Sequence, residues 1–524
     1  MKTIKFLLPF LLLFSLMACH TAKGIQSTDA DNVEITLLQM NDVYEISPSP
    51  DQLGGLARVA TLRKTLLAKN PNTITVLSGD FISPSVIGTL KYEGKRIRGK
   101  QMVETLNTLG LDWVVFGNHE FDYDDQADLQ ARLDESNFGW LAGNVRLKNA
   151  DGSQQPFFKN KGGQKVACPD YTVIPLKLAD GSTLRLGLFG ALINTGRKPW
   201  AVYSDYIESA KASFAALKPQ ADVIVGITHL AIEDDKKLLL AIPELPLIMG
   251  GHEHENSRTI LGQGVVTKAD ANAKTVYIHT IRYNKKTKKT TVFSELRRID
   301  GKIQDDPATA AVVAKWEKIK TDALASSGFD ASKKVTDLTA PLDCREITIR
   351  YQQASVGKMI GDAMIAAGKF SPDCAILNSG SIRVDDILSG SLYEIDIVRM
   401  LPFGGGITEV EMRGTLLRKT LETGWANKGS GGYLQWSKIR YDEAAKKWFI
   451  NEIALDDKKT YKVILPDFLL SGNEQNMSFL KTNPGATPNS TDNPEIPVMH
   501  KPVASDKTDL RNDIRLALIG FLRK

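Results

Sequence analysis

Five short apolar runs mark the first half of the chain, and a polar side chain follows each of them. The runs cover residues 33–40, 73–77, 113–116, 223–228 and 247–249. Their length and the turn residues around them predict buried strands. The side chains that follow are, in chain order, Asp42, Asp80, Asn118, His229, and the pair His252 and His254. Carboxylates, amides and imidazoles are common metal ligands, so five such strand ends predict a metal site.

Helical patterns alternate with these strands. Apolar residues recur at helical spacing over residues 54–67, and residues 101–109 predict a second helix. Alternating strands and helices predict a parallel α/β sheet, which carries its active site at the carboxyl ends of the strands. We therefore expect the polar strand ends to meet at one edge.

The densest of these strand ends is the hexapeptide GNHEFD at residues 117–122. It places the amide of Asn118, the imidazole of His119 and the carboxylate of Asp122 directly after a strand. Taken alone it has a second interpretation, because Gly-Asn is ordinary turn chemistry and a His-x-x-Asp pair can hydrogen-bond only to itself. The four other strand ends favour the catalytic interpretation.

The length of the chain predicts two domains, because 524 residues exceed the size at which one hydrophobic core stops growing. The stretch at residues 307–334 predicts a helix around Trp316 and then a polar connector. A second α/β region follows and ends in a predicted amphipathic helix over residues 509–522. We place the first domain at residues 32–305, the connecting helix and linker at 306–338, and the second domain at 339–524.

The amino terminus predicts export and a lipid anchor. Residues 1–18 combine two lysines with an apolar run too short to span a bilayer, which is typical of a secretory signal peptide. Leu16-Met17-Ala18-Cys19 resembles a bacterial lipobox, which implies cleavage before Cys19 and lipidation of its sulfur; the alternative is a coincidental cysteine. The small, polar residues 19–31 suit a flexible tether. We expect an exported bacterial lipoprotein, membrane-anchored on the periplasmic or cell-surface side.

Charge and cysteine content exclude other classes of function. Loss of residues 1–18 removes two lysines and lowers the formal net charge from +5 to +3, and no long basic run remains. This gives no support for nucleic-acid binding, so we expect a small-molecule substrate and predict no protein partner. The three other cysteines, Cys168, Cys344 and Cys374, lack metal-finger spacing.

The mixture of ligand types favours two metal ions. Two carboxylates, one amide oxygen and three imidazoles suit two divalent ions that share a bridging carboxylate, and such pairs clamp the attacking and leaving oxygens of phosphoryl transfer. His119 is then free to act on the substrate, with its tautomer fixed by Asp122. The sequence therefore predicts hydrolysis of a phosphate ester.

The ordered motifs also resemble a known family. Asp42, Gly79-Asp80, the GNHEFD segment, Thr228-His229 and Gly250-Gly251-His252-Glu253-His254 look like the motif set of the calcineurin-like metallophosphoesterases. The sequence is similar in particular to the exported 5′-nucleotidase and UDP-sugar hydrolase branch. The resemblance implies an α/β fold, with a four-layer αββα metallophosphoesterase domain and a smaller C-terminal α/β nucleotide-recognition domain.

The resemblance also implies roles for these residues. Asp42 and His254 would hold one ion, Asp80 would bridge, and Asn118, His229 and His252 would hold the other. His119 and Asp122 would form the catalytic dyad, and the attacking species would be water held by the metals. The two ions would be Zn, Mn, Mg, Co or Fe.

Tyr44 departs from the family's pattern, which usually has Asp-x-His at the first motif. It could ligate a metal as phenolate, donate a hydrogen bond to bound phosphate, or pack. Because the pKa of a tyrosine is ordinarily about 10, packing or hydrogen bonding is favoured.

Six residues of the second domain resemble the family's substrate-binding positions. They are Arg350, Asn378 and Arg383 for phosphate and ribose, Phe403 and Phe468 for stacking on the base, and Glu474 where the family has an aspartate. Without the resemblance, the phenylalanines would be interpreted as core residues, Arg383 as a surface ion pair and Glu474 as a solvated loop residue.

The sequence therefore predicts a membrane-anchored, metal-dependent phosphomonoesterase that acts on nucleotides. Two alternatives stay open. The same site could act on cyclic nucleotides, UDP-sugars or another phosphate ester, or the chain could be a nucleotide-binding lipoprotein with an impaired metal site.

Overall fold

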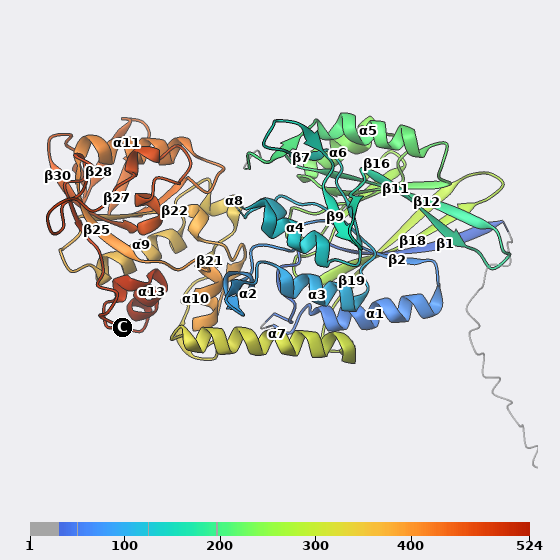
Figure 1. The fold of residues 1–524 in the computed structure, drawn as a ribbon, viewed down its shortest axis with the longest axis horizontal. Coiled ribbons are helices and arrows are strands. Elements are labelled where there is room, and N and C mark those ends of the chain that lie inside the picture. Colours follow the sequence, from blue (N-terminus) through green and yellow to red (C-terminus); the bar gives the residue numbers. More distant parts are fainter. Residues whose placement is uncertain (1–30, 50, 124, 195–197) are drawn as a thin grey trace, which may run out of the picture.

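The computed structural model describes residues 31–49, 51–123, 125–194 and 198–524 (Figure 1). The predicted signal peptide, Cys19 and all but the last residue of the predicted tether lie outside the described residues. Within the described part of the chain, no helix has both the length and the apolar character needed to cross a membrane.

A mixed sheet of six strands carries the first three polar strand ends. In spatial order its strands are β19 (Thr290–Arg298), β18 (Thr275–Asn284), β1 (Asn32–Met40), β2 (Thr73–Leu77), β5 (Trp113–Val115) and β6 (Gly139–Leu141). The last four pair in parallel. The register sets Met40 beside Leu77 and Leu77 beside Val114, so the loops that follow leave the sheet at one edge.

A second sheet of six strands carries the other polar strand ends. Its order is β11 (Tyr171–Lys177), β12 (Thr183–Leu192), β14 (Val223–His229), β15 (Leu247–Met249), β17 (Gly264–Lys268) and β16 (Ser257–Leu261). The four inner strands are parallel, and the two edge strands are antiparallel to their neighbours. The loops after β14 and β15 therefore also leave at the carboxyl edge of their sheet.

The two sheets pack face to face because each strand alternates its side chains between two faces. In β1, Ile35 and Leu37 lie in the core between the sheets, whereas Leu38 and Met40 lie in the core beneath the helices. The covering helices are α1 (Leu56–Lys69), α3 (Lys100–Leu109) and α4 (Gln126–Glu135) on the first sheet, and α5 (Tyr206–Leu217) and α6 (Ile232–Ala241) on the second. This is the αββα order that was predicted.

The second domain is built on a smaller sheet. Its strands, in spatial order, are β26 (Leu434–Ser437), β22 (Cys374–Asn378), β30 (Thr460–Pro466), β25 (Ile407–Arg413) and β31 (Val498–His500). One face packs against α9 (Ser355–Ala367) and α13 (Ile514–Leu522), and the other packs against α11 (Gly414–Ala426). Short helices α8 (Glu346–Ile349), α10 (Glu394–Met400) and α12 (Asp467–Leu470) connect these elements.

Helix α7 (Pro307–Ser326) runs along both domains (Figure 1). Asp306 caps its first turn by accepting the N–H of Thr309 over 3.0 Å. Trp316 is buried in the core of the first domain, and Leu324 is buried in the core of the second. The helix therefore belongs to both hydrophobic cores.

Predicted and observed elements differ at some boundaries. The helix expected over residues 54–67 begins at Leu56, because Gly54 and Gly55 both have positive φ. The terminal helix begins at Ile514, where Asp513 caps it by accepting the N–H of Arg515.

Several strands have no counterpart among the predicted elements. They include the long strands β11, β12, β18 and β19 and the short strands β7 (Val145–Lys148), β8 (Gln154–Gln155), β9 (Phe158–Lys161) and β10 (Gln164–Ala167). Strand β10 is exposed along its whole length, so no buried face leaves a periodic signal in its sequence.

Candidate metal centre

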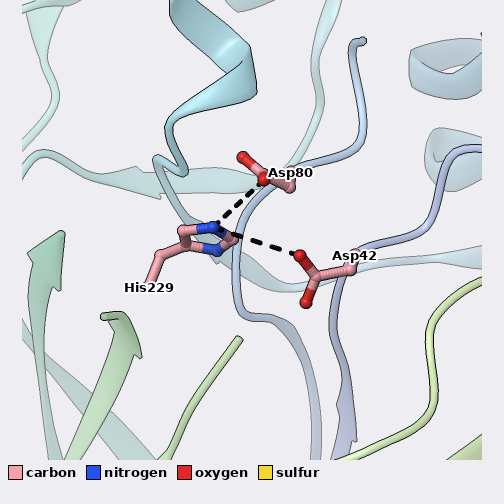
Figure 2. A group of neighbouring side chains, drawn as sticks. All are labelled: Asp42, Asp80 and His229. Carbon is pink, nitrogen blue, oxygen red and sulfur yellow. Dashed lines mark ion pairs between the residues drawn. The ribbon is translucent and has the colours of Figure 1, made fainter. Parts of the chain in front are cut away.

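Two carboxylates and an imidazole meet where β1, β2 and β14 end (Figure 2). One ligand atom from each of Asp42, Asp80 and His229 lies within 4.8 Å of the others, and all three side chains are buried. His229 Nε2 lies 3.1 Å from Asp80 Oδ2 and 4.0 Å from Asp42 Oδ1. These oxygen and nitrogen atoms are a donor set that suits a divalent cation.

Asn118, His252 and His254 join the same cluster. Asn118 Oδ1 lies 3.1 Å from both His229 Nε2 and His252 Nδ1. His254 Nε2 lies 3.7 Å from Asp42 Oδ1. The structure thus brings all six predicted ligands together, with His254 beside Asp42 and with Asn118 between His229 and His252.

The hydrogen bonds of His229 fit a cation at this place. Its Nδ1–H donates to the carbonyl oxygen of Ser78 over 2.7 Å, so in the neutral ring Nε2 carries the lone pair. That lone pair faces oxygen atoms of Asp80 and Asn118 that are also acceptors. Acceptors that face one another need a proton or a metal ion between them, and a divalent ion would satisfy all three.

The backbone is strained at three of these residues. Asp42, Asp80 and His252 have φ values of 52°, 55° and 84°, a region that residues other than glycine rarely adopt. Nearby hydrogen bonds hold them there: Asp42 N–H donates to Gly79 O over 3.1 Å, and His252 N–H donates to Asp42 Oδ2 over 3.0 Å. Strain that the surrounding structure maintains is typical of functional sites.

Burial and close contacts shift the pKa values in the cluster in both directions. Burial raises the pKa of Asp42 and would raise that of Asp80, but His229 and His119 hold the pKa of Asp80 below its usual value. Burial, reinforced by His229, lowers the pKa of His252 to about 3. Burial would also lower the pKa of His229, but Asp80 raises it to about 9. The carboxyl groups and imidazoles of the cluster thus influence one another's pKa values, and a metal ion that binds them would displace their protons.

Glu120, which the sequence reasoning did not single out, ties two ligand loops together. Its buried carboxylate accepts the N–H groups of three successive residues after β2, beginning with Asp80 over 2.9 Å, and that of Gly117 after β5 over 2.6 Å. Burial raises the pKa of this carboxyl to about 7. Its position as an acidic residue inside the GNHEFD segment was the sequence signal that could have identified it.

Lys268 was also missed, and it holds the loops after β14 and β15. Its fully buried Nζ lies 2.9 Å from the carboxylate of Asp235 and pairs with Glu253. It also donates to the carbonyl oxygens of Leu230 and Gly251, each over 2.6 Å. A buried charge with this many partners fixes the geometry of the histidines that these loops carry.

His119 and Asp122 form a hydrogen-bonded pair next to the cluster. His119 Nδ1–H donates to Asp122 Oδ2 over 2.8 Å, and Ser83 Oγ donates to the same oxygen over 2.8 Å. His119 Nε2 lies 3.9 Å from Asp80 Oδ2, on the side of the predicted ligands. Burial would lower the pKa of His119, but Asp122 and Asp80 raise it.

Tyr44 lies among three of the predicted ligands. Its hydroxyl is 3.4 Å from Asp42 Oδ1, 3.3 Å from Asp80 Oδ2 and 3.1 Å from His254 Nε2. Burial, and then Asp80, raises the pKa of this phenol well above its ordinary value. The contacts therefore support a neutral, hydrogen-bonding tyrosine; hydrogen bonding was one of the two roles favoured from the sequence.

Arg383 from the second domain reaches the His119–Asp122 pair. Its Nη2 lies 2.7 Å from Asp122 Oδ2 and 3.1 Å from His119 Nδ1. The Nε atom is buried and has no hydrogen-bond partner among the described residues. Arg383, His119 and His254 line one cavity between the domains.

The other five predicted substrate residues do not line this cavity. Burial raises the pKa of Glu474, opposed by the backbone N–H of Gln475, the amide of Asn378 and the charge of Arg350. Arg350 pairs with Glu346, whose carboxylate also lies 3.5 Å from Arg383 Nη1. Phe403 and Phe468 are 62% and 46% exposed. Of the six residues, the structure brings only Arg383 to the metal cluster.

Two family models match the sequence, one in each domain. Residues 35–256 match the calcineurin-like phosphoesterase family, and residues 333–482 match the 5′-nucleotidase C-terminal domain. The first match contains the six candidate ligands and the His119–Asp122 pair. The second contains the six candidate substrate residues.

Relatives match over most of their length. The 5′-nucleotidase of Bos taurus is 24% identical, and the match covers 84% of this chain and 83% of the relative. The snake venom 5′-nucleotidase of Naja atra is 23% identical, and the match covers 84% of this chain and 90% of the relative. The solved structure of a 5′-nucleotidase precursor from Thermus thermophilus covers 94% of this chain and 96% of its own, at 19% identity and a TM-score of 0.68.

The fold likeness confirms the predicted two-domain α/β architecture, and the family models confirm the resemblance drawn from the motifs. The buried Asp-Asp-His group is compatible with a metal site. Residues 35–256 are therefore a calcineurin-like phosphoesterase domain, residues 333–482 are a 5′-nucleotidase C-terminal domain, and the chain is a 5′-nucleotidase-like metallophosphoesterase.

Proposed function

We propose that this protein hydrolyses the phosphate ester of nucleoside monophosphates with two divalent metal ions. The observation that carries the proposal is the convergence of six oxygen and nitrogen ligands beside the His119–Asp122 pair. Two-metal sites clamp the attacking and leaving oxygens of phosphoryl transfer. The second domain faces this site with Arg383, whose planar guanidinium suits a phosphate group.

The six ligands would divide between two ions, and the contacts within the cluster support this division. Asp42 and His254 would hold one ion, while Asn118, His229 and His252 would hold the other, and Asp80 would bridge them. When bound, the ions, drawn from Zn, Mn, Mg, Co or Fe, would offset the charge of the phosphate and activate the attacking water. Asp80 is suited to bridging because it lies against His229 on one side and the hydroxyl of Tyr44 on the other.

His119 would act on the phosphate rather than on a metal. Its Nδ1–H is held by Asp122, which leaves Nε2 on the side of the cluster. Because the neighbouring carboxylates raise the pKa of the ring, His119 holds a proton more readily than a free histidine. From this position it would donate a hydrogen bond to the charge that develops on the phosphate.

The nucleoside would bind to the second domain. Arg350, Asn378 and Glu474 would contact the ribose and phosphate, and the exposed rings of Phe403 and Phe468 would stack on the base. Because none of these five lines the cavity beside the metal cluster, the domains would have to close around the substrate before reaction.

We also propose that the protein is exported and held at a membrane by a lipid on Cys19. The support is the signal-like segment at residues 1–18 and its lipobox-like end. Replacing Cys19 with alanine should move the protein from the membrane fraction to the soluble fraction. Unchanged membrane association would contradict the anchor.

Phosphate release tests the proposed reaction. Chelator-treated protein, given back one divalent ion at a time, should release phosphate from nucleoside monophosphates and should be inactive before metal is added. Faster turnover of cyclic nucleotides or UDP-sugars would reassign the substrate within the same chemistry. Nucleotide binding without hydrolysis under every metal would favour the alternative of an impaired site.

A further inference from the structure

We propose that Asp385, a residue of the second domain, is a positioning residue for His254 of the first domain and completes the site beside Asp42. The inference rests on the two-metal function proposed above. Its structural basis is the contact between His254 Nδ1 and Asp385 Oδ2, which are 2.8 Å apart. About one fifth of each side chain remains exposed, 21% for His254 and 22% for Asp385, so solvent weakens this pair only in part.

The contact selects the tautomer of His254. When Nδ1–H donates to the carboxylate, the lone pair lies on Nε2. Nε2 is the atom that faces Asp42 Oδ1 at 3.7 Å and the hydroxyl of Tyr44 at 3.1 Å. A metal-binding histidine commonly donates its second N–H to such a carboxylate, and removing that partner typically lowers metal affinity about 10- to 100-fold.

Asp385 is itself held in a fixed position. Its Oδ1 accepts the N–H of Glu346 over 2.6 Å. Its backbone has a φ of 42°, in the region that residues other than glycine rarely adopt. The same loop is joined to the first domain by Arg383, which contacts Asp122 at 2.7 Å. The carboxylate is thus presented to His254 by a loop held at Glu346 and at Arg383.

The two proposed metal sites therefore differ in what orients their histidines. His229 donates its second N–H to the carbonyl oxygen of Ser78, which belongs to its own domain. His254 donates its second N–H to Asp385, which belongs to the other domain. The ion beside Asp42 and His254 should accordingly bind tightly only while the second domain is docked, whereas the ion beside His229 should need the first domain alone.

Metal titration of the mature, chelator-treated protein tests this inference. Calorimetry with Mn²⁺ would compare Asp385→Asn and Asp385→Gly with the control variants Asp386→Asn and Asp386→Gly. Asparagine and glycine both tolerate positive φ, so either replacement at residue 385 removes the charge without new backbone strain. Asp386 is the matched control because it lies on the same loop and pairs with Lys274 rather than with a candidate ligand.

The wild-type protein and both Asp386 variants should bind two ions. Asp385→Gly should weaken one binding event by about 10- to 100-fold and leave the other unchanged. Asp385→Asn should give a smaller loss of the same event, because its amide oxygen can still accept the hydrogen bond.

Two results would overturn the inference alone. One is wild-type affinity for both ions in the Asp385 variants, and the other is an equal loss in the Asp386 variants, which would make the effect one of loop integrity. A wild-type protein that binds no divalent ion would overturn the two-metal function and this inference with it.

Discussion

The metal ligands of the first domain and the two base-stacking rings proposed for the second domain differ in burial. In the first domain, Asp42 and His229 are completely buried and Asp80 is 1% exposed. In the second, the two rings assigned to the base keep about half of their surface in solvent. Buried charges persist only when fixed partners surround them, so the metal side is ordered before substrate arrives. An exposed ring gains stacking energy only when a ligand covers it. The two rings should therefore contribute to the site only when a nucleotide is bound.

The largest effect is expected from the substitution Asp80→Asn, which acts on the buried metal ligands. It removes the charge proposed to lie between the two ions, so turnover should fall by orders of magnitude while the fold persists. Phosphate release and thermal unfolding would be measured together. Asp234→Asn, on the outer helix α6, is the control and should keep full activity. Full phosphatase activity in Asp80→Asn would contradict the bridging role.

The second test acts on the exposed side. Phe403→Ala and Phe468→Ala should each lower kcat/KM on nucleoside monophosphates by roughly 10- to 100-fold, since stacking on a base contributes about 1–3 kcal/mol. Neither change should affect a small phosphomonoester that lacks a base. Phe293→Ala serves as the control, because this ring is similarly exposed on β19 of the first domain. Equal losses on both substrates would make the two rings structural.

A third test concerns the difference between the two metal sites. Tyr44 stands where the family usually has a histidine, so the ion beside Asp42 and His254 should be the weaker of two in a titration. Tyr44→His should tighten that event by about tenfold or more, in line with the size of ligand effects in metal sites. Tyr44→Phe removes only the hydroxyl and should not tighten it. Two equally tight ions in the unchanged protein would count against this prediction.

The smallest expected effect is on stability and lies away from the site. Burial, with Arg258 nearby, lowers the pKa of His279 from 6.5 to about 3. Between these two pH values the unfolded chain therefore binds more protons than the folded protein. The free energy of unfolding should be highest above pH 6.5, as far as His279 determines it, and should fall as the pH drops toward 3. His279→Gln should flatten this part of the profile in urea unfolding.

His500→Gln is the control for that experiment, because His500 stacks on Phe370 at the edge of the second domain. Its profile should follow that of the wild-type protein. An unchanged profile in His279→Gln would mean that other groups cause the acid sensitivity.

The six candidate ligands could be grouped from the sequence because each follows a short, largely apolar run that predicts a buried strand. Parallel strands bring their ends to one edge, so Asp42, Asp80 and Asn118 could be grouped without coordinates. Glu120 was missed because its partners are backbone N–H groups, which every residue type except proline has. Lys268 was missed because its partners, backbone carbonyl oxygens and two carboxylates, lie on other loops.

Contacts between the two domains could not be predicted from the pattern of strands and strand ends. Asp385 reaches His254 only because the second domain docks at the carboxyl edge of the first. No local pattern in the sequence reports that docking, and the same holds for the contact between Arg383 and the His119–Asp122 pair. The predicted roles of these side chains stay predictions until substrate and metal binding are measured.

Helix α7 limits how this chain can be recombined with its relatives. A gene fragment that stops at residue 305 would leave open the surface that Trp316 fills, and its indole N–H would no longer donate to Glu104. A fragment that begins after the helix would lose Leu324 from the other core. A chimaera made from homologous genes should therefore be stable only when α7 and the surfaces that it contacts in both domains come from the same parent.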